Sequence, residues 1–145
     1  MAIHVTSTVD IACDAALAFE TIANFENNPR WQDGMVSAKF TSDPPLRVGS
    51  TYAQEARFMG RPIETLFEIT AYEPGRSITI ESRESTFPIQ VTRRVEDLGD
   101  GRCRVSAEVN GAPGGLFKIA GPLMRRMVSR SVNADYKNLK ALLEG

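Results

Sequence analysis

Residues 88–110 read PIQVTRRVEDLGDGRCRVSAEVN, and this stretch decides the fold. It holds two strand-length runs, 88–97 and 102–110, in which apolar residues alternate with polar ones. A period of two turns one face of a strand toward the core and the other toward solvent. Asp100-Gly101 lies between the runs, and Asp-Gly between alternating runs is the strongest short-range signal for a hairpin. The stretch therefore predicts two antiparallel strands joined by a tight turn.

The chain before this hairpin has the same character. Four more strand-length segments are rich in β-branched or aromatic residues: 35–42, 50–59, 62–72 and 77–84. Turn residues such as proline and glycine separate them, and links this short allow only antiparallel neighbours. Residues 3–11 also alternate and predict a first strand. Together these segments predict a seven-stranded antiparallel sheet.

Two short helices are expected between the first strand and the rest of the sheet. Asp14 is a typical N-cap ahead of an alanine-rich segment. Residues 27–29, Asn-Asn-Pro, should end this helix, because the residue before a proline is pushed out of the α region. A second helical turn is expected over residues 30–33, ended by Gly34. These two helices would plug one end of the curled sheet.

Residues 116–143 predict one long C-terminal helix. Their apolar residues recur every three or four positions and form one broad stripe. At about 1.5 Å per residue this helix would run roughly 40 Å, enough to cross a whole sheet. Pro122 should impose a starting turn or a kink. Because an antiparallel sheet must bury its apolar face, this helix is expected to cover it and to leave an apolar pocket beneath.

The predicted class is thus α+β: a helix-grip fold, in which a seven-stranded curved antiparallel sheet and two short helices surround a long C-terminal helix. A length of 145 residues suits a single domain, 1–145. The net charge of −1 argues against a nucleic-acid binder. No apolar run approaches the roughly 18 residues of a membrane span, so stable membrane insertion is not expected. The N-terminus also lacks the basic start and apolar core of a signal peptide.

The two cysteines, Cys13 and Cys103, are expected to be small buried hydrophobes rather than a disulfide or a metal site. Unpaired cysteines suit the reducing cytoplasm, which is the predicted location. His4 is the one histidine and lies on the polar face of the first strand, so a Ser/His/Asp triad or a histidine metal site is not expected. No metal and no cofactor is predicted.

Several motifs resemble those of the START-like superfamily, which is also called SRPBCC. The resemblance extends over nearly the whole chain. The motifs are Asn27-Asn28-Pro29-Arg30-Trp31, the hairpin Gly99-Asp100-Gly101-Arg102-Cys103-Arg104-Val105, and the closing Asn138-Leu139-Lys140-Ala141-Leu142-Leu143-Glu144. Ala12-Cys13 departs from the usual Ala-Pro before the first helix. The superfamily includes the birch-pollen allergen proteins and the polyketide cyclase/dehydrase-like proteins. The resemblance implies a helix-grip fold and a role in binding, carrying or transforming hydrophobic molecules.

Large or adaptable side chains on the expected inner faces are the candidates for lining the ligand cavity, with core packing as the alternative. These candidates are Trp31, Tyr52, Gln54, Phe58, Phe67, Arg93, Phe117, Met124 and Met127.

Arg93 is the most informative of them, because it shares a face with Val91 and Val95 and should point inward. A buried guanidinium needs a carboxylate or an anionic ligand as its partner. The carboxylates that could serve are Glu64, Glu68 and Glu81. The alternative is an arginine that reaches solvent from the end of its strand.

Three functions remain open. The first is binding or carrying a small hydrophobic molecule, such as a polyketide, a lipid or an aromatic compound, in the apolar cavity. The second is a cyclase/dehydratase-type enzyme without metal or cofactor, in the same cavity and with no catalytic residue assigned. The third is a regulatory or toxin-like protein that acts through its surface, for which the basic helix face is the candidate: Arg126, Arg130, Lys137 and Lys140. A monomer and a homodimer are both compatible with the sequence.

Overall fold

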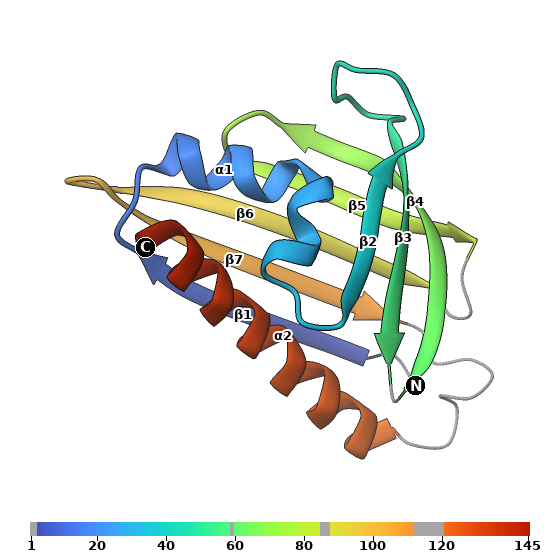
Figure 1. Cartoon of the computed structure of the whole chain (residues 1–145). Coiled ribbons are helices and arrows are strands. Elements are labelled where there is room, and N and C mark those ends of the chain that lie inside the picture. The colour runs from blue at the N-terminus through green and yellow to red at the C-terminus, as the bar shows by residue number, and fades with distance from the viewer. Residues whose placement is uncertain (1–2, 59, 85–87, 112–120) are drawn as a thin grey trace.

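The computed structural model describes residues 3–58, 60–84, 88–111 and 121–145. Its elements (Figure 1) are β1 (Ile3–Ile11), α1 (Ala15–Ala23), η1 (Phe25–Arg30), β2 (Met35–Phe40), β3 (Thr51–Phe58), β4 (Arg61–Glu73), β5 (Ser77–Glu84), β6 (Ile89–Gly99), β7 (Arg102–Gly111) and α2 (Gly121–Glu144). The predicted strands are confirmed: the bounds of β1 and β5 agree with 3–11 and 77–84, and the other five differ by one or two residues at their ends.

The seven strands form one antiparallel sheet in the order β1-β7-β6-β5-β4-β3-β2. The hairpin of β6 and β7 places Val95 opposite Val105, and β1 pairs with the far side of β7. The predicted Asp-Gly turn is confirmed: Asp100 and Gly101 both have positive φ, at 56° and 73°. A tight hairpin turn requires this backbone conformation, which explains the choice of residues.

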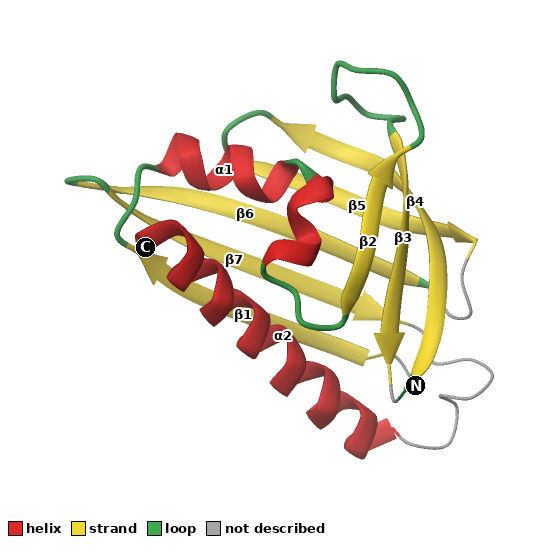
Figure 2. Cartoon of the chain, viewed as in Figure 1, coloured by secondary structure: helices red, strands yellow, loops and turns green. Residues whose placement is uncertain are grey.

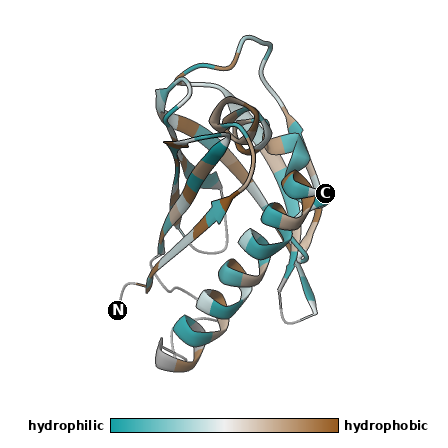
Figure 3. Ribbon diagram, turned by 90° about the vertical axis from the view of Figure 1, so that its left-hand side faces the viewer, coloured by the Kyte–Doolittle hydropathy of each residue, from teal (hydrophilic) through white to brown (hydrophobic). Residues whose placement is uncertain are grey.

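The sheet curls around the long helix, which confirms the predicted helix-grip fold. Figures 1 and 2 show α2 running along the inner side of the sheet beside β1, while α1 and η1 lie across one end of it. Hydrophobic and hydrophilic residues alternate along the strands (Figure 3), and burial alternates in the same way along β1, β4 and β7. Most of the large buried side chains belong to one cluster, to which the sheet, α1, η1 and α2 all contribute.

The two short helices differ from the prediction in where they divide. The helix α1 ends at Ala23, not at the Asn-Asn-Pro segment, because Asn24 leaves the helical region with φ −87° and ψ 93°. The Asn24 side chain then accepts a hydrogen bond from the Glu26 backbone N–H at 3.2 Å and starts η1. The helix η1 is a 3-10 helix that contains Pro29, so the helical turn expected over residues 30–33 is wrong. Asp14 does occupy the N-cap of α1, although its side chain makes no capping hydrogen bond.

The C-terminal helix α2 has 24 residues and a length of about 36 Å. Pro122 is its second residue, a position where the missing backbone N–H costs no helical hydrogen bond. Of the two expected effects of Pro122, a starting turn or a kink, the structure shows the start of the helix. The first part of the predicted helix, residues 116–120, lies outside the described residues. Within the described part of the chain, no helix is long and apolar enough to cross a membrane.

Candidate ligand site

Along β6 the inner face of the sheet changes from fully buried to half-buried, whereas Ile3 and Val5 of β1 and Val109 of β7 stay 4–7% exposed. On β6, Val95 and Arg93 are 7% and 3% exposed, whereas Val91 is half-buried. The helix α2 changes in the same direction: Leu139 is 0% exposed and Val132 is half-buried. We call the first region, beneath α1, η1 and the end of α2, the closed end. The second region, beneath the first turns of α2, is the open end.

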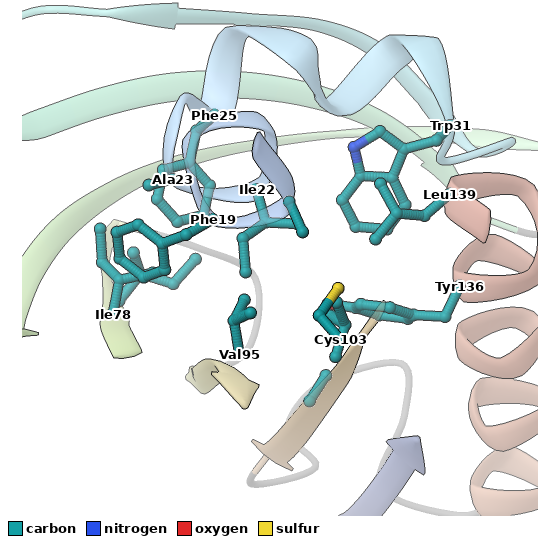
Figure 4. Packing of buried hydrophobic residues seen from close by; sticks show 14 of the residues in the cluster. Phe19, Ile22, Ala23, Phe25, Trp31, Ile78, Val95, Cys103, Tyr136 and Leu139 are labelled. Carbon is teal, nitrogen blue, oxygen red and sulfur yellow. The ribbon is translucent and has the colours of Figure 1, made fainter. Parts of the chain in front are cut away.

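The buried core divides along the same line into two clusters. The larger cluster fills the closed end, where Figure 4 shows Trp31, Leu139 and Tyr136 meeting beside Cys103. The smaller cluster consists of Ile3, Val5 and Val109 at the open end. The half-buried apolar side chains packed against it come from both the sheet and α2: Ile63, Ile89, Val91, Val128 and Val132. Ile89, Val91 and Val132 also pack against the larger cluster, so they join the two. The apolar lining at the open end is thus less completely packed than the closed end.

Polar contacts tie the last turns of α2 to the closed end. Asn138 Nδ2 donates to the Trp31 carbonyl at 3.2 Å and to Asp33 Oδ1 at 3.1 Å. Asp135 Oδ1 accepts from the Asp33 backbone N–H at 3.1 Å. Lys140 Nζ donates to the Asp10 carbonyl at 2.7 Å. The helix is therefore anchored at the end where the core is tightest.

Arg93 lies at the boundary between the two ends, and its predicted inward direction is confirmed. Its Nη1 donates to the Ile22 carbonyl at 2.8 Å and to Asn28 Oδ1 at 3.1 Å. Its guanidinium carbon lies 4.6 Å from the ring centre of Phe25 and 4.8 Å from that of Trp31. Cation–π contacts of this kind stabilise a charge that has left water. The alternative of an arginine that reaches solvent is wrong, since Arg93 is 3% exposed.

The prediction that Glu64, Glu68 or Glu81 could pair with Arg93 is also wrong. Glu68 pairs instead with Arg83, at 2.7 Å between Oε1 and Nε. Glu68 and Glu81 face each other across β4 and β5, on the opposite side of the sheet from Phe67, and Glu64 is exposed. Within the described residues, no carboxylate lies within ion-pair distance of Arg93. Carbonyl oxygens and aromatic faces solvate the cation instead.

Two buried donors at this boundary have no hydrogen-bond partner within the described part of the structure. They are Nε of Arg93 and Nε1 of Trp31. An unsatisfied buried donor costs roughly 1–3 kcal/mol, more when it is charged. Such groups in a native protein call for an explanation, and a bound ligand or water is one. The boundary therefore holds two unsatisfied donors.

An aromatic stack connects this boundary to the far strands of the sheet. Tyr52 stacks on Phe25 at 4.7 Å and on Phe67 at 5.2 Å between ring centres. Trp31 meets Tyr136 edge-on at 4.9 Å. Burial raises the pKa of the Tyr52 phenol, and the nearby charge of Arg93 opposes that shift. Four predicted site residues thus come together: Trp31, Tyr52, Phe67 and Arg93.

The other predicted site residues are either half-buried or have side chains outside the described part of the structure. Gln54 lies two positions from Tyr52 on the inner face of β3 and is half-buried, as is Met127 on α2. Phe58 ends β3 and Met124 belongs to α2, but the side chains of both are outside the described part. Phe117 is outside it altogether. The role of these residues as cavity lining stays a prediction.

Sequence reasoning missed Phe25, Asn28 and Tyr136 as parts of the site. Tyr136 continues the apolar stripe of α2 between Val132 and Leu139, so its spacing could have indicated an inward position. Asn28 gave no such signal, because a polar residue before proline is typical of an exposed turn. Its 1% exposure follows from its contact with Arg93, which no local pattern encodes.

Asp135 is the buried carboxylic acid of the closed end. Burial raises its pKa to about 6, and the hydrogen bond from the Asp33 backbone N–H opposes that shift. Burial also raises the pKa of Tyr136, against the effect of the Arg93 charge. An acid whose pKa lies near neutrality can exchange protons at physiological pH.

The remaining residues that the sequence analysis singled out lie on the surface or in the packed core. Arg126, Arg130 and Lys137 are exposed on α2, as predicted for a basic face, whereas Lys140 is half-buried against β1. Cys13 and Cys103 are both free and buried. His4 is exposed beside Asn110. The described residues contain no group of histidine, cysteine, aspartate or glutamate side chains that could hold a metal ion.

Comparison with known proteins identifies the class. The sequence matches the family described as "Polyketide cyclase / dehydrase and lipid transport" over residues 2–144. The chain therefore belongs to this family, within the START-like superfamily. No curated protein matches it significantly by sequence.

Solved structures with the same fold come from bacteria and plants. A START superfamily protein from Mycobacterium smegmatis superimposes with a TM-score of 0.86 at 14% identity, over 98% of this chain and 97% of that one. The Zhui aromatase/cyclase from a Streptomyces species gives a TM-score of 0.81 at 15% identity, over 99% and 94%. A major latex-like protein from Panax ginseng gives 0.77 at 14% identity, over 99% of each chain. At these identities the likeness establishes the fold alone.

Proposed function

We propose that this protein binds a small hydrophobic molecule at the open end, between the sheet and α2. The observation that carries the proposal is the parallel loss of burial along β6 and α2. Inward apolar side chains such as Val91 and Val132 are half-buried there, although their neighbours at the closed end are 0–7% exposed. An apolar lining that is incompletely packed can take up an apolar guest. The family, whose description includes lipid transport, supports the same function.

The ligand of this proposal carries a carbonyl or carboxylate group directed at the boundary. Nε of Arg93 and Nε1 of Trp31 are buried donors without a partner in the described residues. The positive charge of Arg93 favours an anionic or strongly polarised acceptor. Tyr52 and Phe67 would contact the apolar body of a molecule bound this way. Two free, buried cysteines fit the reducing cytoplasm as the place of action.

Binding of anilinonaphthalene sulfonate, an apolar aromatic anion, tests the proposal. We expect saturable binding of one probe per chain, measured by fluorescence and calorimetry. Val132→Trp should abolish it by filling the open end, while Asn133→Trp, on the adjacent exposed position of α2, should not. Equal binding by the two variants would refute the site. Mass spectrometry of the purified protein under non-denaturing conditions would identify any ligand that it retains.

A second pair of variants tests the acceptor group. Arg93→Gln should weaken probe binding about tenfold, which corresponds to one charge-assisted hydrogen bond. Arg94→Gln is the matched control, because Arg94 is exposed on the opposite face of β6. Thermal unfolding of each variant confirms that it is folded. If both variants bind alike, Arg93 does not orient the ligand.

A cyclase/dehydratase-type enzyme is the second candidate, and Asp135 is the observation that favours it. A buried acid with a pKa of about 6 beside Tyr136 suits proton transfer to or from a carbonyl compound. Incubation with a synthetic poly-β-ketone, followed by mass spectrometry for loss of water, tests this candidate. An enzyme should lose turnover but keep binding in Asp135→Asn. Binding of the ketone without turnover would leave the carrier function.

A further inference from the structure

A hollow of about 780 Å³ opens between α1, the loop that joins β2 to β3, and the turn that joins β4 to β5. None of the residues proposed for the open end lines it. We infer that this hollow is a separate ligand site, and that it takes an organic cation with an apolar body. The inference goes beyond the proposed function, since it concerns another place in the fold and a ligand of the opposite charge.

The walls of the hollow are apolar and come from three segments of the chain. Ala16, Phe19 and Ala23, which share one face of α1, line one side of it. Tyr72, near the end of β4, stacks on Phe19 with 6.2 Å between ring centres and 15° between ring planes. Leu46, from the β2–β3 loop, is half-buried. These walls suit an aromatic or aliphatic body.

The charged residues that line the hollow all have the same sign. They are Glu20, Glu26 and Asp43, and all are exposed; the described lining contains no lysine, arginine or histidine. Glu26 is held in place, because its Oε2 accepts a hydrogen bond from the Phe40 backbone N–H at 3.0 Å. The side chains of Glu20 and Asp43 have no hydrogen bond or ion pair with any described residue. The cation nearest to them in the same loop is Arg47, whose Nη1 donates to the Asp43 carbonyl at 3.3 Å and to the Pro45 carbonyl at 3.1 Å, and not to either carboxylate. The carboxylates of Glu20 and Asp43 therefore have no ion-pair partner among the described residues.

The polar groups at the base of the hollow are already used within the fold. Ser50 is 1% exposed, and its hydroxyl accepts from the Arg47 backbone N–H at 3.0 Å. The Ser42 hydroxyl accepts from the Thr51 backbone N–H at 2.9 Å. Selection would therefore come from the carboxylates and from the faces of Phe19 and Tyr72. Carboxylates attract a cation and repel an anion, and aromatic faces also favour cations.

A matched series of three probes tests the charge preference. Naphthylmethylammonium, naphthylmethanol and naphthylacetate share the same aromatic body and are cationic, neutral and anionic at pH 7. We expect nuclear magnetic resonance shifts at the lining residues, with the cation bound most tightly and the anion most weakly. Equal affinity for the cation and the anion would overturn the inference, as would the absence of saturable cation binding.

Variants on α1 locate the site without disturbing the core. Ala16→Trp should block the hollow and abolish cation binding, since Ala16 lines it and is exposed. Leu17→Trp is the control, because Leu17 is 49% exposed and does not line the hollow. The double variant Glu20→Gln with Asp43→Asn should weaken the cation about fivefold and leave naphthylmethanol unchanged. Equal losses in Ala16→Trp and Leu17→Trp would place the cation elsewhere.

Competition separates this site from the open end. Naphthylmethylammonium should not displace anilinonaphthalene sulfonate, because the two probes occupy different places. Displacement would mean that the cation enters the open end, and it would overturn this inference while leaving the proposed function intact. Failure of anilinonaphthalene sulfonate to bind would contradict the proposed function alone, since the resonance shifts report the cation independently.

Discussion

The closed end and the open end share the same strands and the same helix, but they differ in packing. At the closed end, Leu139 and Val105 are 0% exposed, and polar contacts fasten α2 to the segment that follows η1. At the open end, Val128 and Val132 remain half-buried against a small apolar cluster. One continuous sheet and helix therefore support two kinds of interior. The closed end supplies stability, and the open end, where we propose that the ligand binds, leaves apolar side chains half-buried.

The largest expected difference between the two ends is the cost of removing an apolar side chain. Leu139→Ala should lower the free energy of unfolding by about 3 kcal/mol, because it leaves a cavity in a filled core. Val132→Ala should cost about 1 kcal/mol or less, since its surroundings are already incompletely packed. Urea unfolding of both variants measures the difference. Similar losses would mean that the two ends are equally packed.

The next effect concerns the polar contact at the boundary. Asn28→Ala should lower the free energy of unfolding by about 2 kcal/mol, because Arg93 loses a charge-assisted hydrogen bond in a buried place. The same change should cost clearly less in an Arg93→Met background, where no guanidinium needs the oxygen. A double-mutant cycle by urea unfolding measures this coupling. A coupling of zero would show that Asn28 acts independently of Arg93.

A smaller effect depends on pH and comes from Asp135. Its pKa is raised from the ordinary 3.8 to about 6, so the folded chain keeps a proton that the unfolded chain releases. The free energy of unfolding should therefore fall as pH rises from about 4 to about 6, by about 1–2 kcal/mol. Asp135→Asn should remove this dependence and stabilise the protein at pH 7 by a similar amount.

Urea unfolding at pH 4.5 and pH 7.5 tests the effect of Asp135 on the closed end. Glu64→Gln is a suitable control, since Glu64 is an exposed carboxylate on β4, where it pairs with β3. A pH dependence that survives in Asp135→Asn would assign the effect to another group.

The smallest effect is expected at the start of α2. Leu123 is 62% exposed, so Leu123→Gln should change the free energy of unfolding by no more than about 0.5 kcal/mol. Urea unfolding beside Leu139→Ala compares two leucines of the same helix directly. A loss above 1 kcal/mol for Leu123→Gln would show that the open end is covered more tightly than its exposure indicates.

Local patterns predicted the strands well, because alternation and turn residues act over a few positions. The hairpin at Asp100-Gly101 and the inward face of Arg93 follow from such patterns and are confirmed. The boundary between the short helices is not where the Asn-Asn-Pro segment predicts it, because the Asn24 side chain caps η1 and Pro29 lies inside that helix. The partners of Arg93 could not be predicted, since Asn28 and Ile22 are 65 and 71 residues away in the chain.

The sequence by itself determined the class of this protein. Periodicity, turn chemistry and one long amphipathic segment are local properties, and together they specify a curved antiparallel sheet around a helix. Only the tertiary structure decided which parts of that interior are filled, how the buried cation at Arg93 is solvated, and that Glu20 and Asp43 meet at one hollow. Packing and electrostatics depend on distances between residues far apart in the chain, and no local pattern contains those distances.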